Sequence, residues 1–346
     1  MGICGHYGGT RKFLDGQTIK TLNVTEELRR SLGSTEVLTV DTYGGVKVIP
    51  KCLFGLFKML MFCDNIIILP AQNSIRVFPL FLILLNAIFS KTIHYIVIGG
   101  WLPDLVQLNK RLAHILKKID YIYVETSTMK TRLEAVGFNN VIILPNFKNL
   151  KILDSCEMVK NYKKPYKICT FSRVTEKKGI KDLAEAIVEV NRNLGEVAFL
   201  LDVFGQVDPT FESELETIVN NYESCVSYKG MVDSEKSVSV LADYFFLVFP
   251  TKFYTEGIPG TIIDSYSAGV PVVAAKWESF SDIIEEGVTG IGYEFNQKED
   301  LMKCLLLIYK NPEIITKMKK ACLCKAREYQ PNVLGKILRL KFKEKR

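Results

Sequence analysis

Residues 166–205 read YKICTFSRVTEKKGIKDLAEAIVEVNRNLGEVAFLLDVFG. The segment opens with a strand-like stretch, Tyr166 to Ser172, and continues from Lys178 with apolar residues at helical spacing until Gly195. It closes on Val197 to Gly205, which is almost continuously apolar, as a strand covered by helices on both faces requires. Strand, helix and strand in this order predict a βαβ unit of a parallel, doubly wound sheet.

The same alternation of short strands and amphipathic helices runs through the rest of the chain. In the second half it predicts an acidic helix over 208–223, a helix over 261–268 and strands over 226–231, 245–251, 270–275 and 291–295. In the first half it predicts a helix over 18–31 and strands over 65–69, 94–99, 121–125 and 141–144, and from Lys298 onward the spacing is helical. We expect two Rossmann-like, doubly wound α/β domains that face a central cleft.

The chain of 346 residues is too long for one ordinary hydrophobic core, and a polar stretch near 147–164 marks the expected linker. We place one domain at 1–150 and the other at 151–324, with the tail from about 325 to 346 packing back on the first. The formal charge is +7 over 1–150, −9 over 151–316 and +9 over the last thirty residues. Basic surface suits nucleic acid or anionic lipid, but no nucleic-acid-binding motif is present, so we expect no nucleic-acid partner.

Nine cysteines are scattered along the chain without a Cys-x-x-Cys pair, which is typical of reduced thiols in a cytoplasmic protein. The N-terminus has no basic segment followed by an apolar one, so no secretory signal is predicted. The longest apolar run, over 77–89, is shorter than the roughly 18 to 20 residues that a membrane-spanning helix needs.

Two loops follow predicted strands of the second half, at the edge where parallel sheets bind ligands. In the first, Phe171-Ser-Arg-Val-Thr-Glu-Lys-Lys-Gly179, the side chains of Arg173 and Lys178 add two cations beside a helix N-terminus that already favours anions. That arrangement suits a diphosphate. Taken alone, two such residues are more often solvated surface charges.

The second loop is Pro250-Thr-Lys-Phe-Tyr-Thr-Glu-Gly-Ile-Pro-Gly-Thr-Ile-Ile-Asp264. Gly257 and Gly260 let the backbone approach a ligand, and the amides of the following helix can bind phosphate or sugar hydroxyls. Glu256 and Asp264 can face one pocket as acceptors for vicinal hydroxyls. Each acid taken alone has a simpler alternative. Glu256 could be an ordinary loop charge, and Asp264 could be a first-turn acid stabilised by the helix dipole.

Together with Ser265-Tyr-Ser-Ala-Gly-Val-Pro-Val-Val-Ala-Ala275, the second loop resembles the nucleotide-sugar signature of retaining GT-B glycosyltransferases of the family-four, or group 1, type. That signature is a Glu, seven residues, a second acid and a small-residue helix ending in Gly-x-Pro-Val. The first loop resembles the same family's Gly-Arg-Leu-x-x-x-Lys-Gly segment, with Ser172 in place of the first glycine. The resemblance covers residues 165–295 and is thin before them, where segments 16–21 and 98–103 look like those of bacterial capsule-type members.

The resemblance implies transfer of a sugar, with retention, from a nucleotide-sugar donor to a glycan or lipid-linked acceptor held by the first domain. The capsule-type likeness implies a role in surface polysaccharide or glycolipid biosynthesis. The catalytic residues that it implies are Glu256, which faces the donor sugar, and Arg173 and Lys178, which neutralise the diphosphate. The donor-binding residues that it implies in the second domain are Ile258, Pro259, Gly260, Thr261 and Asp264. The last would bind the ribose hydroxyls, where the family usually has the longer Glu.

Near the N-terminus, Gly5-His-Tyr-Gly-Gly-Thr10 leads to Leu14-Asp-Gly-Gln-Thr-Ile-Lys-Thr21 and resembles the family's Gly-rich loop over the donor phosphates. Its candidates for donor binding are Gly8, Gly9 and Gly16, although a Gly-Gly pair alone is usually just a turn. Many relatives carry a His after a middle strand, where this chain has Gly99-Gly100. We expect His94 to be structural and His6 to lie in the better position.

The chain contains no Asp-x-Asp, so we expect a metal-independent transfer without a cofactor, in which cations and helix N-termini stabilise the departing phosphate. Two other classes stay open. A nucleotide-sugar epimerase would need paired acid and base groups at the sugar, and that signature is missing. A non-catalytic or accessory GT-B subunit of a synthase fits the thin resemblance of the first half, but it predicts eroded donor contacts.

Residues 51–62 and 77–89 are apolar enough to leave two alternatives open. Such helices are usually core in a Rossmann-like half. With the basic first half and tail, they could instead contact an anionic membrane surface, which would place the cytoplasmic protein on the inner membrane face.

Overall fold

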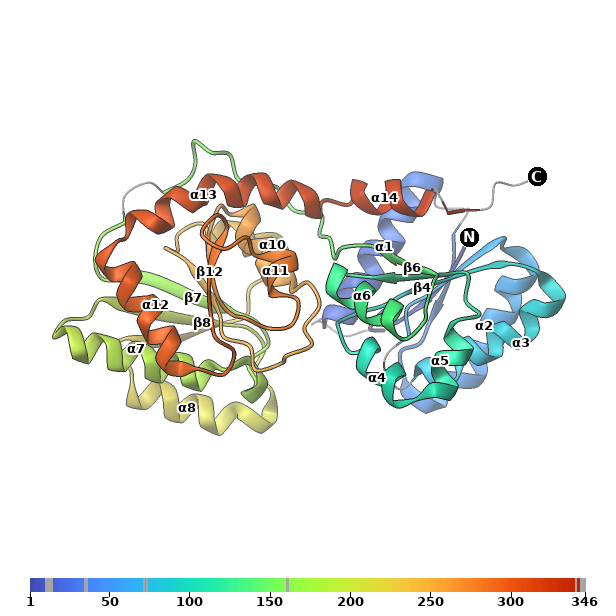
Figure 1. Cartoon of the computed structure of the whole chain (residues 1–346), viewed down its shortest axis with the longest axis horizontal. Helices are drawn as coiled ribbons and strands as arrows, with labels where there is room; N and C mark the ends of the chain where they lie inside the picture. Colours follow the sequence, from blue (N-terminus) through green and yellow to red (C-terminus); the bar gives the residue numbers. More distant parts are fainter. Residues whose placement is uncertain are drawn as a thin grey trace. The chain divides into compact units, whose positions relative to one another are not determined.

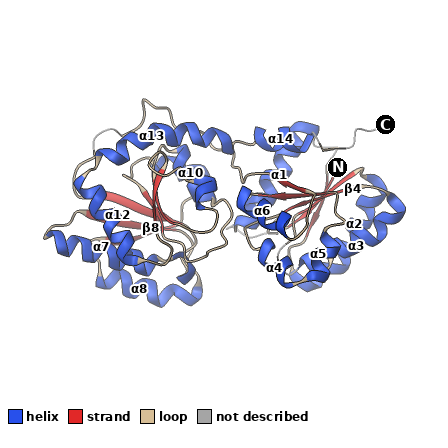
Figure 2. Cartoon of the chain, in the orientation of Figure 1, coloured by secondary structure: helices blue, strands red, loops and turns tan. Residues whose placement is uncertain are grey.

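The computed structural model describes residues 1–9, 15–33, 37–70, 72, 74–159, 162–339 and 341–342. The chain divides into two compact units, one formed by Met1–Asn149 with Gln330–Arg346 and the other by Leu150–Tyr329 (Figure 1). Each unit is built on a six-stranded parallel sheet with helices on both sides (Figure 2). The prediction of two Rossmann-like, doubly wound α/β domains is confirmed.

The sheet of the first unit has the strand order β2-β1-β3-β4-β5-β6. Its strands are β1 (Gly2–Gly5), β2 (Leu38–Asp41), β3 (Asn65–Ile68), β4 (Thr92–Ile96), β5 (Tyr121–Val124) and β6 (Val141–Ile143). Its helices are α1 (Gly16–Leu32), η2 (Gly45–Val48), α2 (Ile49–Phe62), η3 (Ser74–Arg76), α3 (Phe78–Phe89), α4 (Leu102–Leu108), α5 (Lys110–Leu116), α6 (Ser127–Ala135) and α14 (Asn332–Arg339). The order of the strands reverses between β1 and β3, which makes that boundary the switch point of the sheet.

Alternate residues of each strand point to opposite faces, and each face has its own core. On β3, Ile66 and Ile68 join the core under α2 to α6, whereas Ile67 joins the core under α1 and α14. Leu338 of α14 is fully buried in that second core. The last helix therefore covers the first sheet, although it follows the whole second unit in the sequence.

The sheet of the second unit has the strand order β12-β11-β10-β7-β8-β9. Its strands are β7 (Tyr166–Phe171), β8 (Phe199–Phe204), β9 (Val226–Gly230), β10 (Leu247–Phe249), β11 (Val272–Ala275) and β12 (Gly290–Tyr293). Its helices are η4 (Glu176–Lys178), α7 (Ile180–Leu194), η5 (Pro209–Phe211), α8 (Glu212–Asn221), η6 (Ser234–Lys236), α9 (Ser237–Leu241), α10 (Gly260–Ser267), α11 (Phe280–Ile283), α12 (Lys298–Lys310), α13 (Glu313–Ala326) and η7 (Arg327–Tyr329). Strands β8 and β9 follow β7 on one side of the sheet, and β11 and β12 follow β10 on the other side. The switch point therefore lies between β7 and β10.

The sequence predicted most of the strands but not α4, α5 and α6, and it differs from the structure at two strands of the first sheet. It missed β2, because four residues at a sheet edge, half of them exposed, carry little apolar periodicity. It also placed the middle strand of the first half at 94–99, whereas β4 spans Thr92–Ile96 and Gly99 turns the chain with φ +78°. His94 therefore lies in the middle of its strand and not at one end.

The predicted linker near 147–164 is divided between the two cores. Phe147 is buried in the first unit, whereas Leu150, Ile152 and Leu153 pack against the second. The nine cysteines are free thiols. Among the described residues, no helix combines the length and the apolar content needed to cross a bilayer.

Candidate functional site

The loops predicted to carry the site leave the carboxyl ends of β7 and β10, on either side of the switch point of the second sheet. The two strands are neighbours, paired through Leu247 and Cys169. The loop after β8, residues 205–208, lies on the other side of the β7 loop, because β8 pairs with β7 along its whole length. Ligands of doubly wound sheets bind where two crossovers leave in opposite directions, so this edge is the place for a site.

Two buried backbone contacts fix the loop after β7. Val174 is fully buried, its N–H donates to Gln206 O at 2.8 Å, and its O accepts from Asp208 N at 2.9 Å. Gly179 has φ +66°, and a Cβ there would lie 1.9 Å from Pro250 O. Only glycine fits this approach, which holds the start of α7 against the loop after β10.

Arg173 lies at the exposed rim of this edge. Its side chain is 59% exposed, and its Nη2 donates to Asp208 Oδ2 at 2.8 Å. The pKa of the Asp208 carboxyl is lowered, first by hydrogen bonds from the hydroxyl and amide of Thr210 and then by Arg173. Arg173 is thus oriented by an acid of the β8 loop while much of its guanidinium stays open to an anion.

Lys178 and Glu256 form an ion pair across the switch point. Lys178 comes from the end of η4 and Glu256 from the β10 loop, and both side chains are mostly buried. The hydroxyl of Thr251 donates to the same carboxylate oxygen of Glu256 at 3.2 Å. The Lys178 ammonium also lies 5.2 Å from the ring centroid of Phe249. The structure therefore brings together the two residues that the sequence predicted to act on the diphosphate and the sugar.

The predicted donor-binding turn forms the N-terminus of α10. Ile258 is buried, Pro259 takes the N-cap position, and Gly260 is the first helical residue. Pro259 has no side-chain oxygen with which to cap the helix amides. The Thr261 hydroxyl oxygen is buried and has no hydrogen-bond partner among the described residues. A helix start of this kind can bind an anion or a hydroxyl group through its amides.

Asp264 lies deeper than the other acid. It is 3% exposed and accepts a hydrogen bond from Ser237 Oγ at 3.2 Å, at the start of α9. It is the fifth residue of α10, and the first turn of that helix holds no acid. The alternative that Asp264 is a first-turn acid is therefore wrong, because the helix begins one turn before it.

The Gly-rich loop of the first unit leaves the carboxyl end of β1, at that sheet's own switch point. Gly8 and Gly9 have φ +81° and +56°, and a Cβ on Gly9 would lie 2.5 Å from the Tyr43 ring. Gly16 is the first residue of α1, in open space, behind the N-cap Asp15. The stretch 10–14 of this predicted loop, with Thr10 and Leu14, lies outside the described residues.

The sequence missed a buried ion pair in the first unit. Lys20 of α1 pairs with Glu125, and its Nζ also donates to Val97 O at 3.2 Å. Glu125 and Val97 follow β5 and β4 directly, so the pair lies at the carboxyl edge of the sheet. The sequence signal that could have indicated this pair is Glu125, an acid directly after an apolar strand. The sequence also missed three partners of predicted site residues: Asp208, Ser237 and Thr251.

The three histidines differ in their surroundings. His94 is fully buried, its ring nitrogens contact Tyr123 Oη at 3.0 Å and Asn65 Oδ1 at 3.2 Å, and burial lowers its pKa to about 3. The expectation that it is structural fits these contacts. His6 Nδ1 lies 2.8 Å from Thr18 Oγ1, beside the Gly-rich loop, and His114 is exposed on α5.

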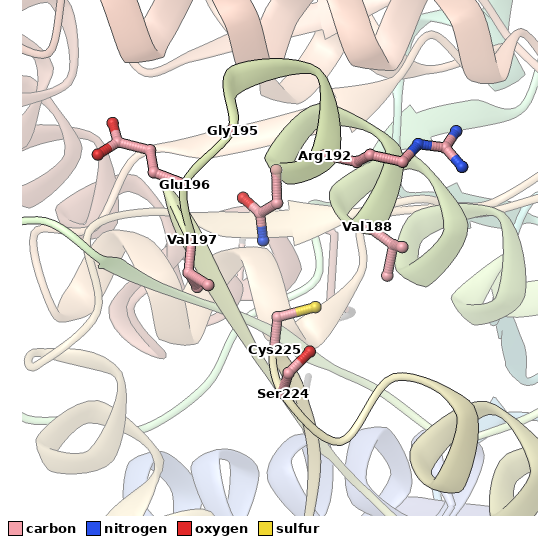
Figure 3. Close-up of a pocket in the computed structure, with 8 residues that line it drawn as sticks. Val188, Arg192, Gly195, Glu196, Val197, Ser224 and Cys225 are labelled. Carbon is pink, nitrogen blue, oxygen red and sulfur yellow. The ribbon is translucent and has the colours of Figure 1, made fainter.

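A pocket of about 320 Å³ lies at the amino ends of the strands of the second sheet, lined by the end of α7 and by the segments that lead into β8 and β9 (Figure 3). Asn191 on its wall already bonds the backbone, donating to Phe199 O and accepting from the amides of Ala198 and Phe199. The pocket is thus held by structural hydrogen bonds at the amino ends of the strands, away from Lys178 and Glu256.

Residues 165–311 match the family model for glycosyl transferases group 1. Most of the second unit is therefore similar to the group 1 glycosyltransferases. All the predicted site residues of that unit lie within the match. The group 1 match begins at β7 and ends after α12, so it contains both loops of the switch point.

Curated relatives agree with the group 1 match. The chain is 26% identical over 170 residues to an alpha-monoglucosyldiacylglycerol synthase of Acholeplasma laidlawii, covering 48% of this chain and 40% of that protein. It is 28% identical over 163 residues to the amylovoran biosynthesis glycosyltransferase AmsK of Erwinia amylovora, covering 45% of this chain and 38% of that protein. The chain spans about half or less of the length of the curated relatives that it matches.

Solved structures extend the likeness to the whole fold. HepE of Anabaena, in a complex with UDP, superposes with a TM-score of 0.75 at 13% identity, covering 98% of each chain. The chain, with its two units, therefore has the GT-B fold.

Proposed function

We propose that this protein is a glycosyltransferase that moves a sugar from a nucleotide-sugar donor to a glycan or lipid-linked acceptor, with retention and without a metal ion. The observation that carries the proposal is the Lys178–Glu256 pair at the switch point of the second sheet. Both side chains are mostly buried at the edge where such sheets bind ligands. The cation suits the diphosphate of the donor, and the carboxylate suits its sugar.

Lys178 and Arg173 act on the diphosphate. In the free protein Lys178 is balanced by Glu256 and Arg173 by Asp208, so both cations are held in place before a ligand arrives. A diphosphate at this edge carries enough negative charge to draw both toward itself. The N-terminus of α10 adds amides and the favourable end of its dipole. These groups replace a metal ion in stabilising the departing nucleotide.

Glu256 faces the donor sugar once Lys178 turns to the phosphate, and Asp264 accepts hydrogen bonds from the ribose hydroxyls. In the transfer, the bond between the anomeric carbon and the donor phosphate oxygen breaks. The acceptor oxygen bonds to the same face of that carbon, and its proton passes to the departing phosphate. The carboxylate and the two cations then stabilise the charge that develops at this step.

The relatives support the substrate class. One is named for glycolipid synthesis and another for the biosynthesis of the polysaccharide amylovoran, so we place the reaction in surface polysaccharide or glycolipid biosynthesis. HepE has been solved with UDP, which makes UDP-sugars the first donors to test. We place the enzyme in the cytoplasm, on the inner face of a membrane that carries the acceptor.

The test is calorimetric titration with UDP-, GDP-, ADP- and CMP-sugars, in EDTA and again in Mg²⁺, with and without anionic vesicles. One donor should bind, with the same affinity in EDTA and Mg²⁺, and Arg173→Ala should weaken it about tenfold or more. Arg192→Ala, an arginine at the amino edge of the same sheet, is the matched control and should leave binding unchanged.

Product analysis by NMR should show the anomeric configuration of the donor. Failure of the folded protein to bind any of the four donors under all these conditions would favour the accessory-subunit alternative. Binding that appears only in Mg²⁺ would contradict the metal-independent step, and an inverted product would contradict retention.

A further inference from the structure

Neighbouring helices α2 and α3 of the first unit expose an unusual amount of apolar surface. Eight of the sixteen large apolar side chains that are exposed in the described part of the chain lie between residues 46 and 88. Seven of them form what we name the α2–α3 face: Phe54, Phe57, Met61, Phe62, Leu80, Leu84 and Ile88. Phe62, Leu84 and Ile88 are 65% exposed or more. Exposed clusters of this kind mark a surface that contacts something apolar.

The α2–α3 face is opposite the side of each helix that builds the core. Leu56 and Leu60 of α2 are fully buried against the sheet, and so is Leu82 of α3. The exposed residues recur at intervals of three or four, at 54, 57, 61 and at 80, 84, 88, so each helix has a second apolar stripe. Both helices cover the same face of the sheet and lie side by side (Figure 1). The Phe57 and Phe89 rings join them edge to face at 5.9 Å. The two stripes therefore form one surface.

The segment that carries the α2–α3 face is basic. Residues 42–91 contain five lysines and arginines but a single acid, Asp64, which pairs with Lys91 at 3.4 Å. The other four cations, Lys47, Lys51, Lys58 and Arg76, are exposed, and none of them forms a salt bridge within the described residues. Lys51 and Lys58 are seven residues apart, on the outer side of α2 itself. An apolar surface whose own helix carries exposed lysines without acidic partners complements an anionic lipid headgroup layer above hydrocarbon.

We propose that the α2–α3 face docks on the surface of an anionic lipid bilayer. The helices would lie in the plane of the headgroups, with the phenylalanines and Ile88 in the outermost hydrocarbon and the lysines among lipid phosphates. A second copy of the chain fits less well, because a two-fold interface would set Lys51 and Lys58 against the same lysines with no acid to pair them. Docking does not depend on the proposed transfer reaction, so it can be tested without any sugar.

The experiment is flotation of the full chain with vesicles of pure phosphatidylcholine or of phosphatidylcholine with phosphatidylglycerol, at low and high salt. The chain should bind the phosphatidylglycerol vesicles at low salt and be released at high salt. Phe62→Ser with Ile88→Ser should lower the partition coefficient about tenfold or more, and Lys51→Gln with Lys58→Gln should do the same. Circular dichroism checks that each variant is folded, as expected for changes at exposed positions.

Matched controls lie elsewhere on the chain. Leu108→Ser with Leu307→Ser removes two exposed leucines, and Lys236→Gln with Lys303→Gln removes two exposed lysines, and neither pair should change vesicle binding. Absence of binding to phosphatidylglycerol vesicles at low salt, or equal losses in the control pairs, would overturn the proposal. A dimer in solution that Phe62→Ser with Ile88→Ser dissociates, without vesicle binding, would assign the face to a second copy instead.

Discussion

Lys178 and Glu256 are 78 residues apart in the sequence and form an ion pair across the boundary between β7 and β10, with Thr251 donating to the same carboxylate. The pair holds the loops of the switch point together and balances each charge in the absence of ligand. A diphosphate must compete with Glu256 for Lys178. The two residues should therefore have opposite effects on donor binding.

Removal of Lys178 leaves Glu256 unbalanced beside an incoming diphosphate. We expect Lys178→Ala to weaken donor binding by about 2 kcal/mol or more, through loss of a charge-assisted contact and added repulsion. Glu256→Gln should keep or strengthen donor binding while it lowers kcat about a hundredfold, because the sugar loses its carboxylate. Calorimetry and initial rates measure the two effects separately. Lys252→Ala, a lysine of the same loop that pairs with Asp182, is the control. Equal losses of affinity in both site variants would contradict the competition.

Gly179 and Gly195 border the same helix and allow a matched test of backbone packing. Their φ angles are +66° and +69°, but a Cβ would meet Pro250 O at 1.9 Å at the first and nothing within 4 Å at the second. Gly195→Ala should cost about 1 kcal/mol from the left-handed conformation alone. Gly179→Ala should cost at least about 2 kcal/mol more, because the loops of the site must separate. Urea denaturation measures both free energies of unfolding. Similar values for the two variants would show that a small shift of the loop removes the clash with Pro250 O.

Asp264 can be tested through the ribose. With UDP and its 2′-deoxy form as ligands, the intact protein should prefer UDP about tenfold, and Asp264→Ala should bind the two alike. Thr261→Ala, in the same helix, should keep the preference. An undiminished preference in Asp264→Ala would show that this acid does not bind the ribose.

Burial of His94 makes stability depend on pH. Its pKa is about 3 in the folded chain and about 6.5 when exposed, so the unfolded state binds the extra proton between these values. Stability is therefore complete above pH 6.5 and falls as the pH drops, by up to about 1.4 kcal/mol per pH unit, until the folded pKa is reached. Denaturation at several pH values should show this slope, and His94→Gln should reduce it. His114→Gln, at an exposed position, should leave it unchanged, and a slope that survives His94→Gln would assign it to other groups.

The buried pair of Lys20 and Glu125 should respond to single and double substitution differently. Lys20→Met alone leaves a buried carboxylate without its cation, and we expect a loss of about 3 to 5 kcal/mol. Lys20→Met with Glu125→Leu should recover most of that loss, because an apolar pair needs no compensation. Thermal denaturation of the two variants tests the difference. A double variant less stable than Lys20→Met would mean that Glu125 is held mainly by its other contacts.

The sequence by itself determined the βαβ order, most strand positions and the two loops of the second unit, because those depend on local periodicity and on glycines at fixed spacing. It could not determine the partners. Lys178 meets Glu256 only because β10 is added beside β7, and Asp264 meets Ser237 only because α9 packs beside α10. Strand β2 was missed because an edge strand has few apolar positions, and α14 joins the first sheet through the burial of Leu338. The outward apolar stripes of α2 and α3 were visible as hydrophobic runs. Only the tertiary structure decided which side of each helix faces the core, because a helix that is apolar on all sides does not indicate from its sequence which side is buried.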